Sequence, residues 1–298
     1  MEQFAAVSPL GDGLSLIELR RIHDNEKRYL RERNVITPEM EGSEYAMVAV
    51  GRHEDFVILI NEEDHFRIQV IRPGLQFTEA YRIADKIDSE LNRFVPYAFS
   101  DELGYLTSCT SNLGTGLRVS ALLHLPVVTM KNRVQDLVPE EKKNFVDVRG
   151  TAGRSNRPLG GIYQLASRVS LGLSEIDIIE IADEVLGRII DLEDTLRDEH
   201  FSETRIEIED SVCRSFGILS CARRLSYVEA MEHLSGVRLG VILAVVKNTD
   251  IQAVNDMMVT SQWAHLQRHY GIIFKNAVEC DEYRAEYLRN NLKNSGVR

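Results

Sequence analysis

Along the first two-thirds of the chain, apolar and polar positions alternate in short runs, as they do in strands of an antiparallel sheet with one covered face. The clearest pattern predicts a hairpin. Its first strand is the apolar run Phe56–Ile60, its second strand covers 66–71, and the tip between them reads NEEDH. On the second strand, Phe66, Ile68 and Val70 share one face. Other strands are expected within 45–71 and at 105–108, 117–125, 145–148 and 162–166.

Apolar residues at helical spacing predict helices at 14–32, 78–94, 130–143 and 174–196. From about Val212 onward only helical patterns occur, and Ser226 with Glu229 forms a capping box. We therefore expect an α+β fold with a boundary near residue 200. A catalytic-type domain would cover 1–200, and an all-helical C-terminal module would cover 201–298.

Composition narrows the function classes. The 298 residues carry 35 basic and 46 acidic side chains, a net charge of −11, which argues against a nucleic-acid binder and a general membrane-surface binder. No apolar run is long enough to span a bilayer, and the N-terminus has no secretory signal pattern. The four cysteines, Cys109, Cys213, Cys221 and Cys280, show no paired spacing. We expect a cytoplasmic protein with reduced thiols and no metal site in the protein itself.

The hairpin tip is the most informative segment for chemistry. It gathers three carboxylates and a histidine, and Arg67 follows at once on the second strand. A carboxylate base beside a cationic phosphate clamp is what transfer of a phosphoryl group to a basic nitrogen requires. Taken alone, this signal is weak, because an acidic turn is usually just a solvated turn.

Three further segments follow the tip in a fixed order: TSCTSNLGTGLRVS at 107–120, VRGTAG at 148–153 and CDEYRA at 280–285. Together with NEEDHFR, they resemble the bacterial protein-arginine kinase branch of the ATP:guanido phosphotransferase (phosphagen kinase) family. The resemblance runs from about Leu19 to about Lys293. It implies a curved antiparallel sheet flanked by helices, of the glutamine synthetase-like type, followed by a helical module.

The resemblance also assigns roles. Glu63 would orient the substrate guanidinium and take its proton, and Cys109 would lie beside that guanidinium, although a small buried hydrophobe is the ordinary alternative for a cysteine. ATP with Mg²⁺ would be the cofactor. The residues implied to contact the nucleotide are Arg67, Arg118, Val119, Ser120, Arg149, Gly150, Thr151 and Gly153.

In the C-terminal module, Asp281 and Arg284 match a phosphoarginine-binding motif, but Cys280 replaces its first arginine. A weakened phosphate pocket and a simple surface helix pair are both open explanations. By resemblance, the partners would be a protein substrate presenting an arginine, a zinc-binding activator protein, an AAA+ protease system and a second copy of the chain in a homodimer.

Four departures from the family bear on activity, among them Asn34, which stands where the family has a histidine, and Arg157, which replaces an acidic residue of the loop at 149–157. An N-terminal arginine-bearing strand has no counterpart, and Arg154 stands where the family has the second glutamate that grips the substrate. A cation facing a cationic substrate is repulsive. We therefore weigh three hypotheses: a catalytically impaired regulatory pseudokinase, which we favour, an active kinase for arginine side chains in proteins, and an interaction module without affinity for ATP.

Overall fold

The structure is a computed structural model that describes residues 13–52, 54–151 and 158–297. The chain forms two compact units that interleave along the sequence. The first unit comprises Met1–Val119, Asn144–Val146 and Ala166–Glu184, and the second comprises Ser120–Lys143, Asp147–Leu165 and Val185–Arg298.

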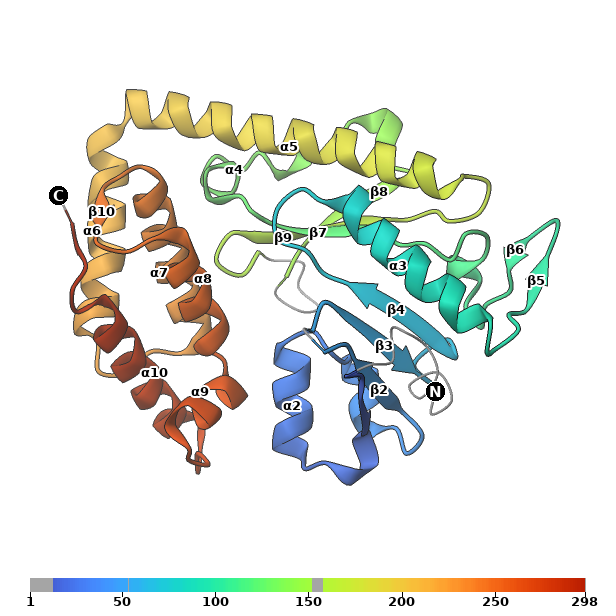
Figure 1. The fold of residues 1–298 in the computed structure, drawn as a ribbon. Coiled ribbons are helices and arrows are strands. Elements are labelled where there is room, and N and C mark those ends of the chain that lie inside the picture. Colours follow the sequence, from blue (N-terminus) through green and yellow to red (C-terminus); the bar gives the residue numbers. More distant parts are fainter. Residues whose placement is uncertain (1–12, 53, 152–157, 298) are drawn as a thin grey trace. The chain divides into compact units, whose positions relative to one another are not determined.

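A four-stranded antiparallel meander forms the centre of the first unit (Figure 1). Neighbouring strands pair in sequence order: β1 (Ser15–Glu18), β2 (Met47–Val50), β3 (Phe56–Ile60) and β4 (Phe66–Val70). Ile60 pairs with Phe66, and Leu59 pairs with Arg67, so the register of the predicted hairpin closes at the NEEDH tip.

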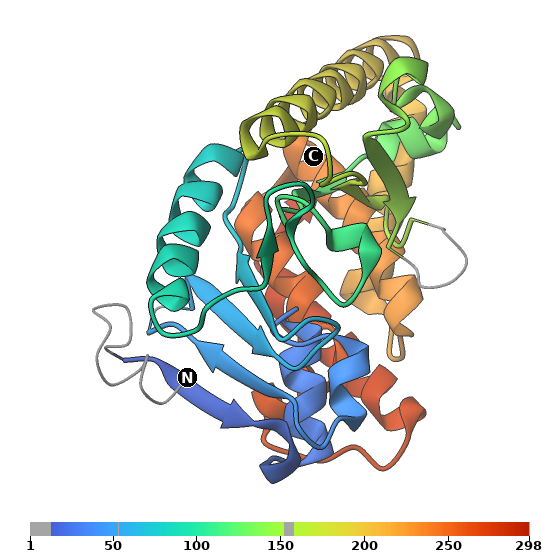
Figure 2. The same ribbon diagram turned by 90° about the vertical axis from the view of Figure 1, so that its right-hand side faces the viewer.

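All five residues of β3 are buried, because both faces of the sheet are covered. Val57 and Leu59 pack into a core with Leu19, Val35, Ile36 and Met40, which surround helix α2 (Asp24–Glu32) and the 3-10 turn Pro38–Gly42. Phe56, Ile58 and Ile60 pack on the other face against helix α3 (Phe77–Asn92), through Ile87 and Leu91. Figure 2 shows the sheet between α3 and α2.

A second sheet has the order β7–β9–β8, with β7 at Ser120–His124, β8 at Val146–Gly150 and β9 at Ile162–Ser167. A short hairpin, β5 (Phe99–Ser100) and β6 (Gly104–Tyr105), belongs to the first unit. Helix α4 (Pro126–Met130) follows β7, and its N-terminal amides of Val127 and Val128 donate to the buried carboxylate of Glu193, at 3.0 and 2.9 Å.

Helices make up most of the remainder of the described chain (Figure 1): α5 (Glu175–Glu203), α6 (Arg205–Cys221), α7 (Tyr227–Ile242), α8 (Ile251–Thr260), α9 (Trp263–Tyr270) and α10 (Ala277–Leu292). Helix α7 packs against α6 and α8, and α10 packs against α6 and α9. The capping box is confirmed, because the Ser226 hydroxyl accepts from the amide of Glu229. Among the described residues, no helix is long and apolar enough to cross a bilayer.

The predicted α+β class is confirmed, with an antiparallel sheet, flanking helices and a helical C-terminal part. Two helix predictions were wrong in part. The segment 14–32 begins as strand β1, because its backbone pairs with β2; a 3-10 turn at Leu19–Arg21 follows, and the α-helix starts only at Asp24. The segment 130–143 holds two 3-10 turns, Val134–Asp136 and Glu140–Lys142, after the short α4.

The C-terminal module is also not all-helical, because β10 (Val246–Lys247) and β11 (Gly296–Val297) form a two-residue antiparallel pair. Such a short ladder carries no sequence period that could reveal it. The domain division at residue 200 stays a prediction.

A polar node joins the end of β7 to helix α7 within the second unit. Arg238 donates from Nη1 to Nδ1 of His124 at 2.8 Å, and Nε2 of His124 lies 2.8 Å from the hydroxyl of Ser235. An arginine can only donate, so Nδ1 accepts and the proton of the neutral imidazole sits on Nε2. Burial, and secondly the Arg238 guanidinium, lower the pKa of His124 to about 3.

This node predicts acid sensitivity. The unfolded chain takes up a proton on His124 near its ordinary pKa of 6.5, whereas the folded protein does not until about pH 3. Neutral His124 therefore contributes fully to the free energy of unfolding above pH 6.5. Between about pH 6.5 and pH 3, this contribution falls by about 1.4 kcal/mol per pH unit. Urea unfolding between neutral pH and about pH 5 should show a steeper loss for wild type than for His124→Asn, which cannot titrate. Equal slopes would contradict the assignment.

Candidate active site

The tip of the β3–β4 hairpin is held by its own polar groups. Asn61 adopts a left-handed conformation with φ of 55°, and its side-chain amide donates to the carbonyl of Tyr45 at 3.1 Å. The side chain of Glu62 is only 9% exposed, accepts from the amide of Glu63 at 2.8 Å and lies 3.5 Å from the Arg67 guanidinium. Glu62 therefore organises the turn, and the adjacent Glu63 is left exposed.

Asp64 ties this tip to the loop that carries Cys109. One carboxylate oxygen accepts from the amide of Ser108 at 2.6 Å, and the other accepts from the side-chain amide of Asn112 at 2.8 Å. The same Asn112 amide lies 3.3 Å from a carboxylate oxygen of Glu63. Segments more than 40 residues apart in sequence thus meet around Glu63, within the first unit.

The loop that carries Cys109 makes a tight turn directly after this residue. Residues Thr110–Asn112 form a 3-10 turn, in which the amide of Asn112 donates to the carbonyl of Cys109 at 3.0 Å. Cys109 is partly exposed, and its sulfur lies 3.1 Å from the hydroxyl of Ser111. Cys109 is therefore not fully buried as a small hydrophobe would be.

The same loop is seated on Ser170. The Ser170 hydroxyl donates towards the carbonyls of Ser111 and Leu113, at 3.2 and 2.7 Å. Gly114 has φ of 98°, and a Cβ there would come within 2.3 Å of the Ser170 carbonyl oxygen. Only glycine allows the backbones to approach this closely.

The arginines implied for the nucleotide fall in both units. In the first unit, Arg67 is half exposed, and Arg118 is exposed beside the buried Val119, whose amide donates to the Ser167 hydroxyl at 3.0 Å. Ser120, the first residue of β7, is exposed in the second unit.

The remaining residues implied for the nucleotide belong to the second unit or lie outside the described residues. Arg149 pairs with Asp147 near the end of β8, and Gly150 and Thr151 follow it. Gly153, Arg154 and Arg157 lie outside the described residues.

Asp281 and Arg284 form an ion pair on α10, in which the Arg284 side chain is buried. Arg284 is 3% exposed and donates to the carbonyls of Ser261 and Leu225, each at 2.7 Å. It also donates to the Cys280 sulfur at 3.1 Å and to the carboxylate of Asp281. Each guanidinium nitrogen donates to at least one group inside the protein, so Arg284 cross-links the loops around α10.

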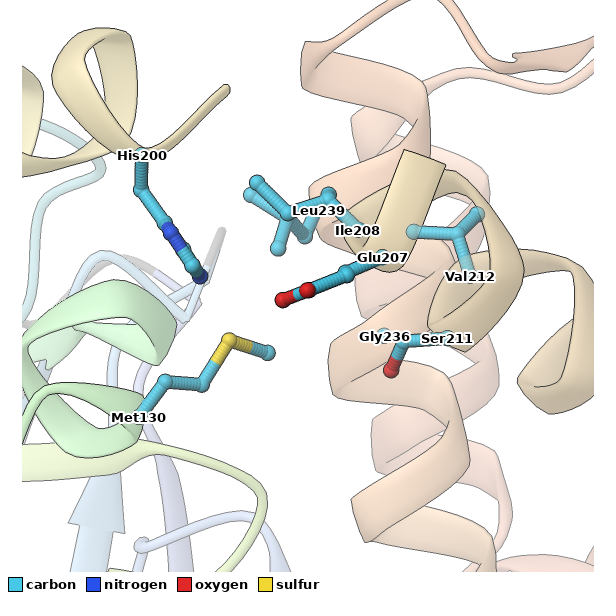
Figure 3. A pocket seen from close by; sticks show the side chains of 8 residues that line it. All are labelled: Met130, His200, Glu207, Ile208, Ser211, Val212, Gly236 and Leu239. Atoms are coloured by element: carbon cyan, nitrogen blue, oxygen red, sulfur yellow. The ribbon is translucent and has the colours of Figure 1, made fainter. Parts of the chain in front are cut away.

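A cavity of about 70 Å³ lies elsewhere in the second unit (Figure 3). It is far smaller than the several hundred Å³ that enclose a nucleotide-sized ligand. His200 and Met130 face Glu207 across it, and the Thr204 hydroxyl lies 2.7 Å from Nδ1 of His200. Desolvation is the main cause that lowers the pKa of His200. Across the described ranges, no group of three or more His, Cys, Asp or Glu residues could hold a metal ion.

Sequence reasoning named Glu63, Cys109 and the arginines, but not Asp64 and Asn112, whose contacts join the segments of Glu63 and Cys109. Both stand inside the quoted motifs. Their roles arise from a contact across 48 residues, which no local pattern reveals.

Comparison with known proteins identifies the family. Residues 2–196 match the family model "ATP:guanido phosphotransferase, C-terminal catalytic domain", and residues 205–297 match "Protein-arginine kinase McsB C-terminal domain". Protein-arginine kinases from Geobacillus sp. (strain WCH70) and Bacillus subtilis (strain 168) are 38% and 35% identical to the chain. Each match covers 93% of this chain, and 77% and 76% of those relatives respectively.

Two solved structures show the same fold. The duplicated taurocyamine kinase of Schistosoma mansoni aligns with a TM-score of 0.58 at 24% identity, over 67% of this chain and 29% of that one. Lombricine kinase aligns with a TM-score of 0.56 at 21% identity, over 66% of this chain and 58% of that one. The chain belongs to the ATP:guanido phosphotransferase family, in its protein-arginine kinase branch.

The buried arginine gives a stability prediction. Replacing Arg284 with alanine leaves two buried carbonyls without donors, and we expect it to lower the free energy of unfolding by at least about 3 kcal/mol. Arg214→Ala, which removes an exposed pair with Asp210 on α6, is the matched control and should cost less than about 1 kcal/mol. Urea unfolding measures both. Equal small losses would show that Arg284 is not a structural cross-link.

Proposed function

We propose that this chain is an ATP-dependent protein-arginine kinase with weakened phosphotransfer, and that its role is mainly regulatory. The observation that carries the proposal is the Asp64 contact, because it joins the tip bearing Glu63 to the loop bearing Cys109. An exposed carboxylate and a thiol on linked segments are suited to a guanidinium group, which presents several N–H donors and a positive charge.

Chemistry at this site requires positioning above all. A guanidinium is a poor nucleophile, because its charge is delocalised and persists above about pH 12. In the proposed reaction, a substrate arginine nitrogen bonds to the γ-phosphorus of ATP, the bond from that phosphorus to ADP breaks, and Glu63 takes the displaced proton. Asn112 lies 3.3 Å from Glu63 and limits where that carboxylate points.

The phosphates would be held by Arg67, Arg118 and Arg149, through charge-assisted hydrogen bonds. Val119, Ser120, Gly150, Thr151 and Gly153 would line this side of the site, where the amide of Val119 and both donors of Thr151 already bond within the protein. Mg²⁺ would be bound mainly by phosphate oxygens and water, which suits an ion that keeps much of its hydration shell.

Weakened catalysis rests on the sequence alone. Arg154 stands at the position of the family's second substrate-gripping glutamate, and its charge repels a guanidinium. The contacts around Glu63 support a kinase in general, so a fully active kinase is the alternative. The zinc-binding activator, the AAA+ protease system and the homodimer stay predictions from the resemblance.

The role of Glu63 is tested by Glu63→Gln, which keeps the side-chain shape and removes the base. We expect phosphotransfer from ATP to an arginine-containing protein to fall at least about 100-fold, with the Kd for Mg–ATP changed less than about threefold. Incorporation of labelled phosphate and isothermal calorimetry supply the two readouts.

The matched control is Glu79→Gln, which removes an exposed carboxylate on α3 that pairs with Arg82. It should leave both readouts unchanged. Phosphotransfer that survives Glu63→Gln at the wild-type rate would rule out Glu63 as the base. Wild-type protein without phosphotransfer or affinity for ATP would overturn the proposed function in favour of an interaction module.

A further inference from the structure

Within the second unit, helix α7 contacts two backbone segments: the end of β7 and the segment that leads into β9. Its residues Ser235 and Arg238 hold His124 at the end of β7, and its N-terminal half packs against the Gly160–Gly161 segment that leads into β9. One helix of the C-terminal part thus touches two neighbouring strands of the second sheet.

The contact with β7 is specific in its donors and acceptors. Arg238 donates from Nη1 to His124 and from Nε to the side chain of Asn255 on α8 at 3.0 Å, so one guanidinium spans two helices and a strand. His124 in turn donates from Nε2 to Ser235 at 2.8 Å. Ser235 is 7% exposed, so water does not replace its hydrogen bond.

The contact with the strand β9 entry is steric. Gly160 and Gly161 have φ of 57° and 67°. A Cβ on Gly160 would come within 2.6 Å of the Met231 carbonyl oxygen of α7, and one on Gly161 would lie 3.4 Å from the Ser235 hydroxyl. The amide of Leu125 donates to the carbonyl of Gly161 at 2.8 Å, so the two contacts share one patch of backbone.

The Gly160–Gly161 segment is linked by hydrogen bonds to Thr151, which follows Arg149 and Gly150. Both the amide and the hydroxyl of Thr151 donate to the carbonyl of Ile162, at 3.3 and 3.1 Å. Ile162 is the next residue after Gly161 in the chain. A shift of Gly161 on α7 would therefore move the acceptor that fixes Thr151.

We propose that Ser235, His124 and Arg238 are positioning residues through which helix α7 fixes the Arg149–Thr151 segment for nucleotide binding. The proposal rests on the proposed function for its link to ATP, and on the contacts above for its link to the backbone. A ligand or partner that shifts α7 would alter the affinity for ATP without touching the phosphates.

The test compares two buried serines of the helical part. Ser235→Ala removes the hydroxyl that bonds to His124. Ser215→Ala removes a buried hydroxyl on α6 that lies 3.5 Å from His233 of α7 and does not bond to β7 or to the segment leading into β9. Hydrogen exchange detected by mass spectrometry reads out the amides of 149–151 and 160–163. Calorimetry gives the Kd for Mg–ATP, and urea unfolding gives the stability of each variant.

We expect Ser235→Ala to speed exchange in both peptides and to raise the Kd for Mg–ATP, each by at least about fivefold. Ser215→Ala should leave both unchanged, even where its loss of stability is as large. Wild-type exchange at 149–151 in Ser235→Ala would overturn the proposal. Faster exchange with no ATP affinity even in wild type would support the positioning role and reject the proposed function instead.

Discussion

The arrangement of the candidate site depends on the carboxylate of Asp64. Its two oxygens accept from the backbone of Ser108 and from the side chain of Asn112, so a hairpin tip and a distant loop become one surface. The contact can form only because β3 is buried on both faces, which fixes the register of the hairpin. A slip by one residue would turn every side chain of the strand to the opposite face.

Two close backbone approaches in the structure also depend on glycine. Gly114 lets the Cys109 loop lie against the Ser170 backbone, and Gly160 lets the entry to β9 lie against α7. Both positions have positive φ and would bring a Cβ within 2.6 Å of a carbonyl oxygen. The segments TSCTSNLGTG and RPLGG therefore carry information about backbone approach as well as about chemistry.

Sequence patterns predicted the elements in which a regular apolar pattern runs over many residues or continues into a neighbouring strand. The β3–β4 hairpin and the helices beginning at Phe77 and Glu175 are of this kind. Strand β1 was missed, because Leu16, Leu19 and Ile22 also fit a helical stripe and only pairing with β2 decides between the two. Tertiary contacts override local propensity in such short segments.

The site was predicted unevenly for the same reason. Glu63 and Cys109 could be named from motifs, but the contacts of Asp64 and Asn112 that link them could not. For Arg284 the sequence left a phosphate pocket and a surface pair both open, and it did not indicate that the guanidinium lies among backbone carbonyls of two loops. The helical spacing of a residue predicts which side of the helix it occupies. It does not predict which carbonyls of other segments lie beside it.

The central claim is that the family's chemistry persists in this chain but is weakened at Arg154. The most direct measurement is the rate of ATP-dependent arginine phosphorylation by wild type, Arg154→Glu and the surface control Arg214→Glu. The account predicts a rise of at least about tenfold for Arg154→Glu, equivalent to about 1.4 kcal/mol of barrier, and no rise for the control. An unchanged or lower rate for Arg154→Glu would contradict it.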